Sequence, residues 1–253
     1  MTDEIPEYIE IIILRQVGDK NACDQGTGQA HRFKYALQPG EQPTALDVLI
    51  RAREEAFHDL AFRYGCRNRK CGLCTLEING KPRLACKTKV RDGDRLGPLQ
   101  GLPVIRDLVV DRTGINGQLA GRIGGDHRRS SWEPLVPGGI FVSLSGCIAC
   151  YACLKGCPLH EMNLGAFHRP RDFETPKETV VYAYGNPYTF LRLRRIVEDN
   201  ERDQKTRDQA LSTALSLGLE TCRECLGCRC QMGIPLIREV IEPLLKDIEK
   251  LRT

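Results

Sequence analysis

Apolar and polar residues divide the chain into an N-terminal part with strand patterns and a C-terminal part with helix patterns. Tyr8 to Leu14 is apolar and β-branched, and His31 to Leu37 alternates, so both segments are predicted strands. A helix is predicted after Thr44, which is a suitable N-cap. The apolar positions of that helix are Ala45, Val48, Leu49 and Ala52.

A hairpin is predicted next. Cys74 to Ile78 and Lys81 to Ala85 flank Asn79-Gly80, and this dipeptide is the strongest short hairpin signal because both turn residues need a positive φ. The order of strand, strand, helix and hairpin is that of a small β-grasp domain, which we expect over residues 1–110.

The remaining chain has two different patterns. Residues 111–145 hold seven glycines and are predicted to be a connector, not a packed element. Residues 146–253 are predicted to be helical, and the fold class is therefore α+β. The helices expected there are Tyr188 to Asp199, Thr206 to Leu217 and Leu236 to Leu251. Pro235 suits a first helical position, and Pro243 should kink or shorten the last helix.

Composition changes this picture little, apart from cysteine. A chain of 253 residues with 41% hydrophobic residues is long enough for two domains, and a net charge of +4 does not suggest a nucleic-acid partner. The sequence shows neither a signal peptide nor an apolar run long enough to cross a bilayer, so we expect a cytoplasmic location. Thirteen cysteines are too many and too closely spaced for disulfides in a reducing compartment, which favours metal ligation.

The first cysteine set is predicted to hold a [2Fe-2S] cluster. Its spacing, C-x4-C-x2-C-x11-C, is close to that of plant-type ferredoxins. The ligands are Cys66, Cys71, Cys74 and Cys86. Three come from one loop, in which Gly72 is expected to let backbone amides approach the cluster, and the hairpin returns the fourth to it. Zinc is the alternative for four thiolates, but zinc sites usually pair two short knuckles, whereas this loop surrounds a larger object.

Two further sets are predicted to hold [4Fe-4S] clusters. Residues 147–158 follow C-x2-C-x2-C-x3-C-P, in which the fourth cysteine crosses to a second cluster. The distal cluster is then assigned to Cys157, Cys222, Cys225 and Cys228, and the middle cluster to Cys147, Cys150, Cys153 and Cys230. Cys230 is assigned by counting, because the usual fourth position of the later run is Met232. An incomplete middle cluster with an exchangeable site is the alternative.

Together these motifs resemble the iron–sulfur subunit of the succinate dehydrogenase and fumarate reductase family. The stretch YGCRNRKCGLCTLEINGKPRLAC, from Tyr64 to Cys86, is similar to the two-iron loop and hairpin of that family. GLPVIRDLVVD, from Gly101 to Asp111, is similar to the segment that ends its first domain. The resemblance continues from Gly146-Cys147 to Gly233-Ile234-Pro235 and covers nearly the whole chain.

The resemblance implies a β-grasp domain, a helical ferredoxin-type domain and the function of an electron-transfer subunit. Such a subunit of an oxidoreductase relays electrons between an FAD-containing flavoprotein subunit, which acts on succinate or fumarate, and a quinone or other acceptor. It implies no substrate chemistry on this chain alone. The other expected partners are a membrane anchor or a soluble electron-carrier subunit, and partners would hold the protein at the cytoplasmic face of the inner membrane.

Two departures from the family pattern favour an alternative. Cys225 stands where most family members have an apolar or small residue and a [3Fe-4S] cluster, so a distal four-iron cluster is expected here, with a three-iron cluster as the alternative. Residues 159–162, LHEM, replace the tryptophans of the respiratory dehydrogenases. The alternative complex has a flavoprotein that acts on another unsaturated acid or an acyl thioester, with a low-potential soluble electron partner.

Other residues carry weaker signals. His160 is expected to be an ordinary, partly exposed histidine, although it could tune a cluster from beside Cys157. Cys23 is expected to be a free thiol. The basic cluster of Arg128, Arg129, Arg192, Arg194 and Arg195 is expected to be a solvated face, with docking of an acidic subunit or of lipid headgroups as the alternative.

Overall fold

The computed structural model describes residues 7–16, 28–124, 139–164, 182–225 and 227–252. The chain forms two compact units, and each is described by itself. The first contains residues 1–111, 148–152 and 167–171, and the second contains the rest. Cys23, His127, His168, Arg128 and Arg129 lie outside the described residues.

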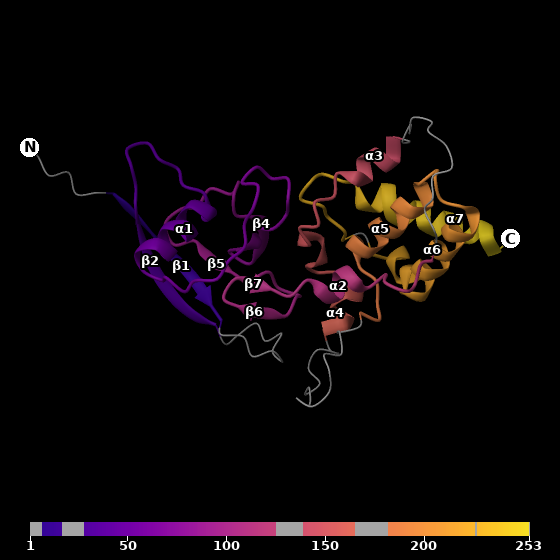
Figure 1. Cartoon of the computed structure of the whole chain (residues 1–253), viewed down its shortest axis with the longest axis horizontal. Helices are drawn as coiled ribbons and strands as arrows, with labels where there is room; N and C mark the ends of the chain where they lie inside the picture. The colour runs from indigo at the N-terminus through magenta and orange to yellow at the C-terminus, as the bar shows by residue number, and fades with distance from the viewer. Residues whose placement is uncertain (1–6, 17–27, 125–138, 165–181, 226, 253) are drawn as a thin grey trace, which may run out of the picture. The chain divides into compact units, whose positions relative to one another are not determined.

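A five-stranded sheet in the order β2-β1-β5-β3-β4 forms the first unit, and Figure 1 shows its strands beside α1. β1 pairs antiparallel with β2 and parallel with β5, whereas β3 pairs antiparallel with β4 and β5. The elements are β1 (Tyr8–Arg15), β2 (Gln29–Ala36), α1 (Ala45–Glu55), β3 (Thr75–Ile78), β4 (Lys81–Leu84) and β5 (Arg95–Gly97). A separate two-stranded sheet joins β6 (Val104–Arg106) and β7 (Val109–Val110). The predicted β-grasp fold is confirmed.

Local sequence explains where α1 begins. The Thr44 side chain accepts a hydrogen bond from the amide of Asp47 at 3.2 Å, and the Asp47 carboxylate accepts one from the amide of Thr44 at 2.9 Å. This reciprocal capping box satisfies two amides that lack helical partners. All four apolar positions predicted on this helix are buried, as expected.

The β3–β4 hairpin has the predicted turn. Asn79 and Gly80 have φ of 51° and 70°, and Ile78 pairs with Lys81 across the turn. These positive φ values match the right-handed twist of the two strands. The amide of Ala85 donates to the carbonyl of Cys74 at 3.1 Å, so the hairpin sets Cys74 next to the segment that carries Cys86.

Helices form the second unit. They are α2 (Thr113–Gly117), α3 (Gly139–Ser145), α4 (Pro158–Leu164), α5 (Pro187–Glu198), α6 (Gln204–Ser216) and α7 (Glu242–Arg252). Two 3₁₀ turns, Ala152–Leu154 and Leu219–Arg223, accompany them. α5, α6 and α7 surround one apolar core that includes Phe190, Leu193, Ala214, Val240 and Leu244 (Figure 1).

A π-helical turn, Ile237–Ile241, precedes α7. Pro243 lies at the second residue of α7 and supplies no amide to the helix. The predicted interruption near Pro243 is thus present as a widened turn, a form in which π-helices often occur within longer helices.

The expectation that residues 111–145 contain no packed element is wrong for the described part of that segment. Ile115 and Leu144 are fully buried, and Leu119 joins the core of the second unit. Gln118 is also buried, and its amide group donates to the carbonyl oxygens of Tyr182 and Tyr184 at 3.1 and 2.7 Å. Glycine content concealed the apolar spacing at 115 and 119, which is helical.

No helix in the described ranges is long and apolar enough to span a membrane.

Candidate iron–sulfur centres

The loop that follows Tyr64 is shaped to stabilise negative charge on sulfur. Arg67 and Arg69 have φ of 52° and 55°, which turns the amides of Asn68 and Lys70 toward one thiol. Both amides donate to the Sγ of Cys66, at 3.3 and 3.2 Å. These hydrogen bonds, from Asn68 and then Lys70, lower the pKa of Cys66 to about 7.

The other thiols of this set are less exposed than Cys66. Cys71 is partly buried, whereas Cys74 and Cys86 are buried. Burial raises the pKa of Cys74 to about 11, with its neighbour Cys86 adding to the shift. A thiol in such a place keeps its proton unless a cation replaces it, and thiolate-binding metals do so. Four soft sulfur donors with two inward amides therefore fit an iron–sulfur cluster.

Gly72 lies where two cysteine-bearing segments of the first unit meet. Its φ is +65°, and a Cβ built on it would lie 3.0 Å from the backbone nitrogen of Cys150 and closer still to the carbonyl oxygen of Ile148. Only glycine combines this backbone angle with this approach. Gly72 was expected to matter for the approach of amides to the cluster, but its packing against residues 148–152 could not be inferred from the sequence.

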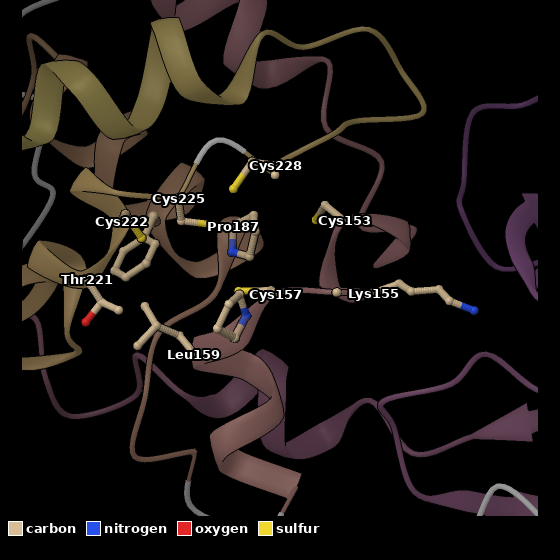
Figure 2. A pocket seen from close by; sticks show the side chains of 13 residues that line it. Cys153, Lys155, Cys157, Leu159, Pro187, Thr221, Cys222, Cys225 and Cys228 are labelled. Carbon is tan, nitrogen blue, oxygen red and sulfur yellow. The ribbon is translucent and has the colours of Figure 1, made fainter.

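The second unit contains a pocket of about 430 Å³ lined by cysteines from three places in the chain (Figure 2). Cys157 precedes α4, Cys222 lies in the 3₁₀ turn Leu219–Arg223, and Cys225 and Cys228 follow that turn. These are the four residues that the sequence assigns to the distal cluster. Cys153, which the sequence assigns to the middle cluster, also lies on the pocket wall.

Apolar and cyclic side chains complete this distal pocket. Leu159, Pro187 and Phe190 line it, and Figure 2 shows the side chain of Lys155 directed away from the cysteines. The pocket therefore surrounds its sulfur atoms with low-dielectric groups, which is one of the ways in which a protein adjusts a cluster's potential.

Burial raises the pKa of the thiols in the distal pocket. Burial and the neighbouring thiols raise the pKa of Cys222 to about 12 and that of Cys228 to about 11. The pKa of Cys157 is also raised by burial, although the amides of His160 and Leu159 act in the opposite direction. Like-charge repulsion among four thiolates is relieved by bound cations, so this donor set fits a cluster of several iron ions.

The third set is spread over both units. Cys147, Cys153 and Cys230 pack against the core of the second unit, whereas Cys150 is buried in the first. Ala149 and Tyr151 on either side of Cys150 have φ of 50° and 60°, the same alternation as in the Cys66 loop.

The choice between Cys230 and Met232 has a local structural correlate. The backbone amide of Met232 donates to the Sγ of Cys230 at 3.3 Å. The same two-residue offset joins Asn68 to Cys66. Met232 therefore supports a thiolate at Cys230 through its backbone.

A site for a single metal ion is a different matter. Across the described ranges, no group of three or more histidine, cysteine, aspartate and glutamate side chains is arranged to hold a metal ion.

His160 differs from the sequence expectation. It is 1% exposed, not partly exposed, and its ring stacks on Tyr182 with centroids 6.0 Å apart. Leu159 and Asn163 on the same helix are also buried. The spacing of 159, 160 and 163 marks one helix face, which was the signal that could have identified it.

Arg194 also differs from the expectation of a solvated basic face. It is 6% exposed and forms ion pairs with Glu198 and with Asp247, the latter at 2.7 Å. Arg192 and Arg195 lie on another side of α5, in a groove considered below.

Comparisons with known proteins agree with the motifs. Residues 10–116 match the family of the 2Fe-2S iron-sulfur cluster binding domain. An uncharacterised iron-sulfur protein of Methanocaldococcus jannaschii is 33% identical over 81% of this chain and 38% of its own length. A fumarate reductase (CoM/CoB) polypeptide of Methanothermobacter marburgensis is 29% identical over 85% of this chain and 40% of its own length. The chain thus spans about two fifths of these relatives.

Shorter relatives carry related names. The mitochondrial iron-sulfur subunit 1 of the succinate dehydrogenase of Oryza sativa is 30% identical over 76% of this chain and 66% of its own length. Among solved structures, a chain of the Mycobacterium smegmatis Sdh1 complex superposes with a TM-score of 0.74 at 21% identity and 97% coverage of both chains, which establishes the shared fold.

Proposed function

Since this chain is a relative of the iron–sulfur subunits of succinate dehydrogenases and fumarate reductases, we propose that it carries electrons between a flavoprotein subunit of that type and a quinone or another acceptor. The observation that carries the proposal is the presence of three cysteine sets on one chain, two of which lie within shaped, sulfur-lined sites. The partner would hold FAD and perform the substrate chemistry.

Each cysteine set has a proposed occupant. The two-iron cluster would be held by Cys66, Cys71, Cys74 and Cys86, the middle four-iron cluster by Cys147, Cys150, Cys153 and Cys230, and the distal four-iron cluster by Cys157, Cys222, Cys225 and Cys228. Such clusters supply one-electron chemistry at potentials that the protein adjusts.

The chain's own residues would adjust these potentials in opposite directions at the two ends. The amides of Asn68 and Lys70 stabilise negative charge at Cys66, which makes reduction easier. Burial of Cys222 and Cys228 disfavours added negative charge, which makes reduction harder.

A second function in the same class is favoured by Cys225, which lines the distal pocket, and by Leu159 and His160 at the place of the family's tryptophans. In it the flavoprotein acts on another unsaturated acid or an acyl thioester, with a soluble low-potential electron partner. One relative is named for CoM and CoB, not for a quinone. In both versions we place the chain in the cytoplasm. A membrane-anchor partner would hold it at the inner membrane, whereas a carrier subunit would leave it soluble.

Anaerobic purification of the native complex tests the proposal. We expect copurifying flavin, about ten iron atoms per chain, and reduction of the clusters by succinate. The control is Cys23→Ser, which removes a cysteine outside all three sets and should leave the iron content unchanged. A complex without flavin whose clusters no dicarboxylate reduces would contradict the succinate/fumarate assignment.

The distal acceptor is tested by a redox titration of the same complex. A distal four-iron signal at low potential favours the soluble partner, and a three-iron signal at the potential of quinones favours the quinone. For the middle set, Cys230→Ser should abolish one four-iron spectrum, and unchanged iron content would remove Cys230 from the ligands.

A further inference from the structure

An arginine-lined groove lies on the second unit, away from its cysteines. It encloses about 980 Å³ between the segment from α2 to Gly124, helix α3 and the far half of α5. Leu119, Ile123 and Ile196 supply apolar surface. Arg192, Arg195 and Arg202 supply positive charge, and Asp199 is the acidic residue among them.

The charge of this arginine groove is not balanced. Asp199 pairs with Arg202 at 3.1 Å. Arg192 donates to the carbonyl oxygen of Asn116 at 2.9 Å, but neither Arg192 nor Arg195 has a carboxylate within ion-pair distance in the part of the chain that the structure describes. Two positive charges therefore remain, at positions three apart on one helix, where side chains are neighbours.

Arg195 is held in place for a ligand. Its guanidinium lies 5.6 Å from the centre of the Phe141 ring, and its Nε is buried with no hydrogen-bond partner. An arginine fixed by an aromatic ring loses little freedom when it binds a carboxylate, and its planar fork matches the two carboxylate oxygens. A buried donor without an acceptor is costly, and a ligand that supplies the acceptor removes that cost.

The apolar surface continues beyond the groove. Ile140 and Val142, the neighbours of Phe141 on α3, are 41% and 56% exposed. Arginine and aromatic side chains beside exposed aliphatic ones are typical of protein–protein interfaces. The extent of this surface favours a macromolecule over a small anion. Because the arginines are stacked on rings and set into a concavity, a protruding acidic segment fits them better than a flat layer of headgroups.

Helix α5 connects this groove to the distal pocket. Pro187 and Phe190 line the cysteine pocket, whereas Arg192 and Arg195 line the groove. At 100° per residue, these two pairs face opposite sides of a helix that is about 10–12 Å across. A chain seated in the groove would thus lie one helix away from Cys157, Cys222, Cys225 and Cys228.

We propose that the arginine groove docks an acidic segment of a partner protein, with a carboxylate on Arg195 and a second one on Arg192. That the partner exchanges electrons at the distal end rests on the proposed function, whereas the docking itself does not. The groove then determines which soluble or anchor subunit can reach the distal pocket.

Site-specific cross-linking in the native host tests the docking. Ala120, an exposed residue on the groove wall, is replaced by p-benzoylphenylalanine, and the adduct is sequenced by mass spectrometry. We expect an adduct with an Asp- and Glu-rich peptide of another protein. Arg192→Gln combined with Arg195→Gln should lower its yield about tenfold. The matched control is Arg238→Gln, which changes a 75% exposed arginine outside the groove.

Each other outcome overturns the proposal. These outcomes are adducts with lipid, adducts only with this chain, no adduct, and a yield that the two groove substitutions do not change. A second probe at Leu251, which is 52% exposed on α7, should not give the same adduct. The readout needs no cluster, so iron content measured on the same samples distinguishes failure of docking from failure of the electron-transfer proposal.

Discussion

Replacing Gly72 by alanine should be far more damaging than the same change at Gly80 or Gly93. All three glycines have φ between +65° and +79°. A Cβ at Gly80 or Gly93 meets nothing within 4 Å, whereas at Gly72 it meets the backbone of Ile148 and Cys150. The two control positions therefore isolate the cost of the backbone angle from the cost of the contact.

The magnitudes follow from these two costs. A left-handed alanine costs about 1–2 kcal/mol, so Gly80→Ala and Gly93→Ala should each lower the apparent melting temperature by about 3–6 °C. At Gly72 the backbone of a second segment must also move, as in an overpacked core, for a total of about 3–5 kcal/mol and a decrease of about 10–15 °C.

The assay is anaerobic thermal unfolding followed by circular dichroism, with iron content and visible absorption measured before heating. Gly80→Ala should keep the full spectrum, because its new methyl group touches nothing. Gly72→Ala should lose iron, because the Cys71–Cys74 loop and the segment around Cys150 are forced apart. Equal decreases in all three variants would show that residues 148–152 do not pack against Gly72, and the reasoning would be refuted.

Three other predictions concern single residues. Cys225→Ser should lower the iron content by about one atom and produce a three-iron electron paramagnetic resonance signal, since it removes one of the four proposed distal ligands; an unchanged spectrum would exclude Cys225. Thr44→Ala should cost about 1 kcal/mol in urea unfolding by removing the N-cap of α1, whereas Thr44→Ser should cost little. Burial and the hydrogen bond to Glu41 raise the pKa of Tyr35 to about 12 from 10.0, so the unfolded chain loses this proton first and stability should fall as pH rises from about 10 to 12. Tyr35→Phe should lessen that fall, and ultraviolet titration of tyrosinate in both proteins measures the pKa directly.

Much of the first unit could be predicted because its signals are local. Asn79-Gly80 specifies its own turn, and Thr44 with Asp47 specifies the start of α1. The cysteine sets could be assigned to clusters for a similar reason, since ligand spacing is set by the size of the cluster that the loop surrounds.

The features that escaped prediction depend on pairing between distant segments. The spacing of apolar residues around Arg194 shows that it lies near the buried face of α5, but its partner Asp247 is on α7, 53 residues away. No local pattern fixes how α5 is rotated and shifted against α7, and the ion pair depends on both. The same applies to Gln118, whose partners Tyr182 and Tyr184 are 64 and 66 residues away.

Arg192, Arg194 and Arg195 show how one short sequence is divided among different roles by helix geometry. Arg194 is buried, and its charge is compensated by Glu198 and Asp247, because an uncompensated charge there would be costly. Arg192 and Arg195 lie in the groove, where solvent lowers the cost of an uncompensated charge and leaves it available to a ligand. A run of basic residues in a sequence therefore gives the total charge, whereas the rotation of the helix determines which of those charges can select a partner.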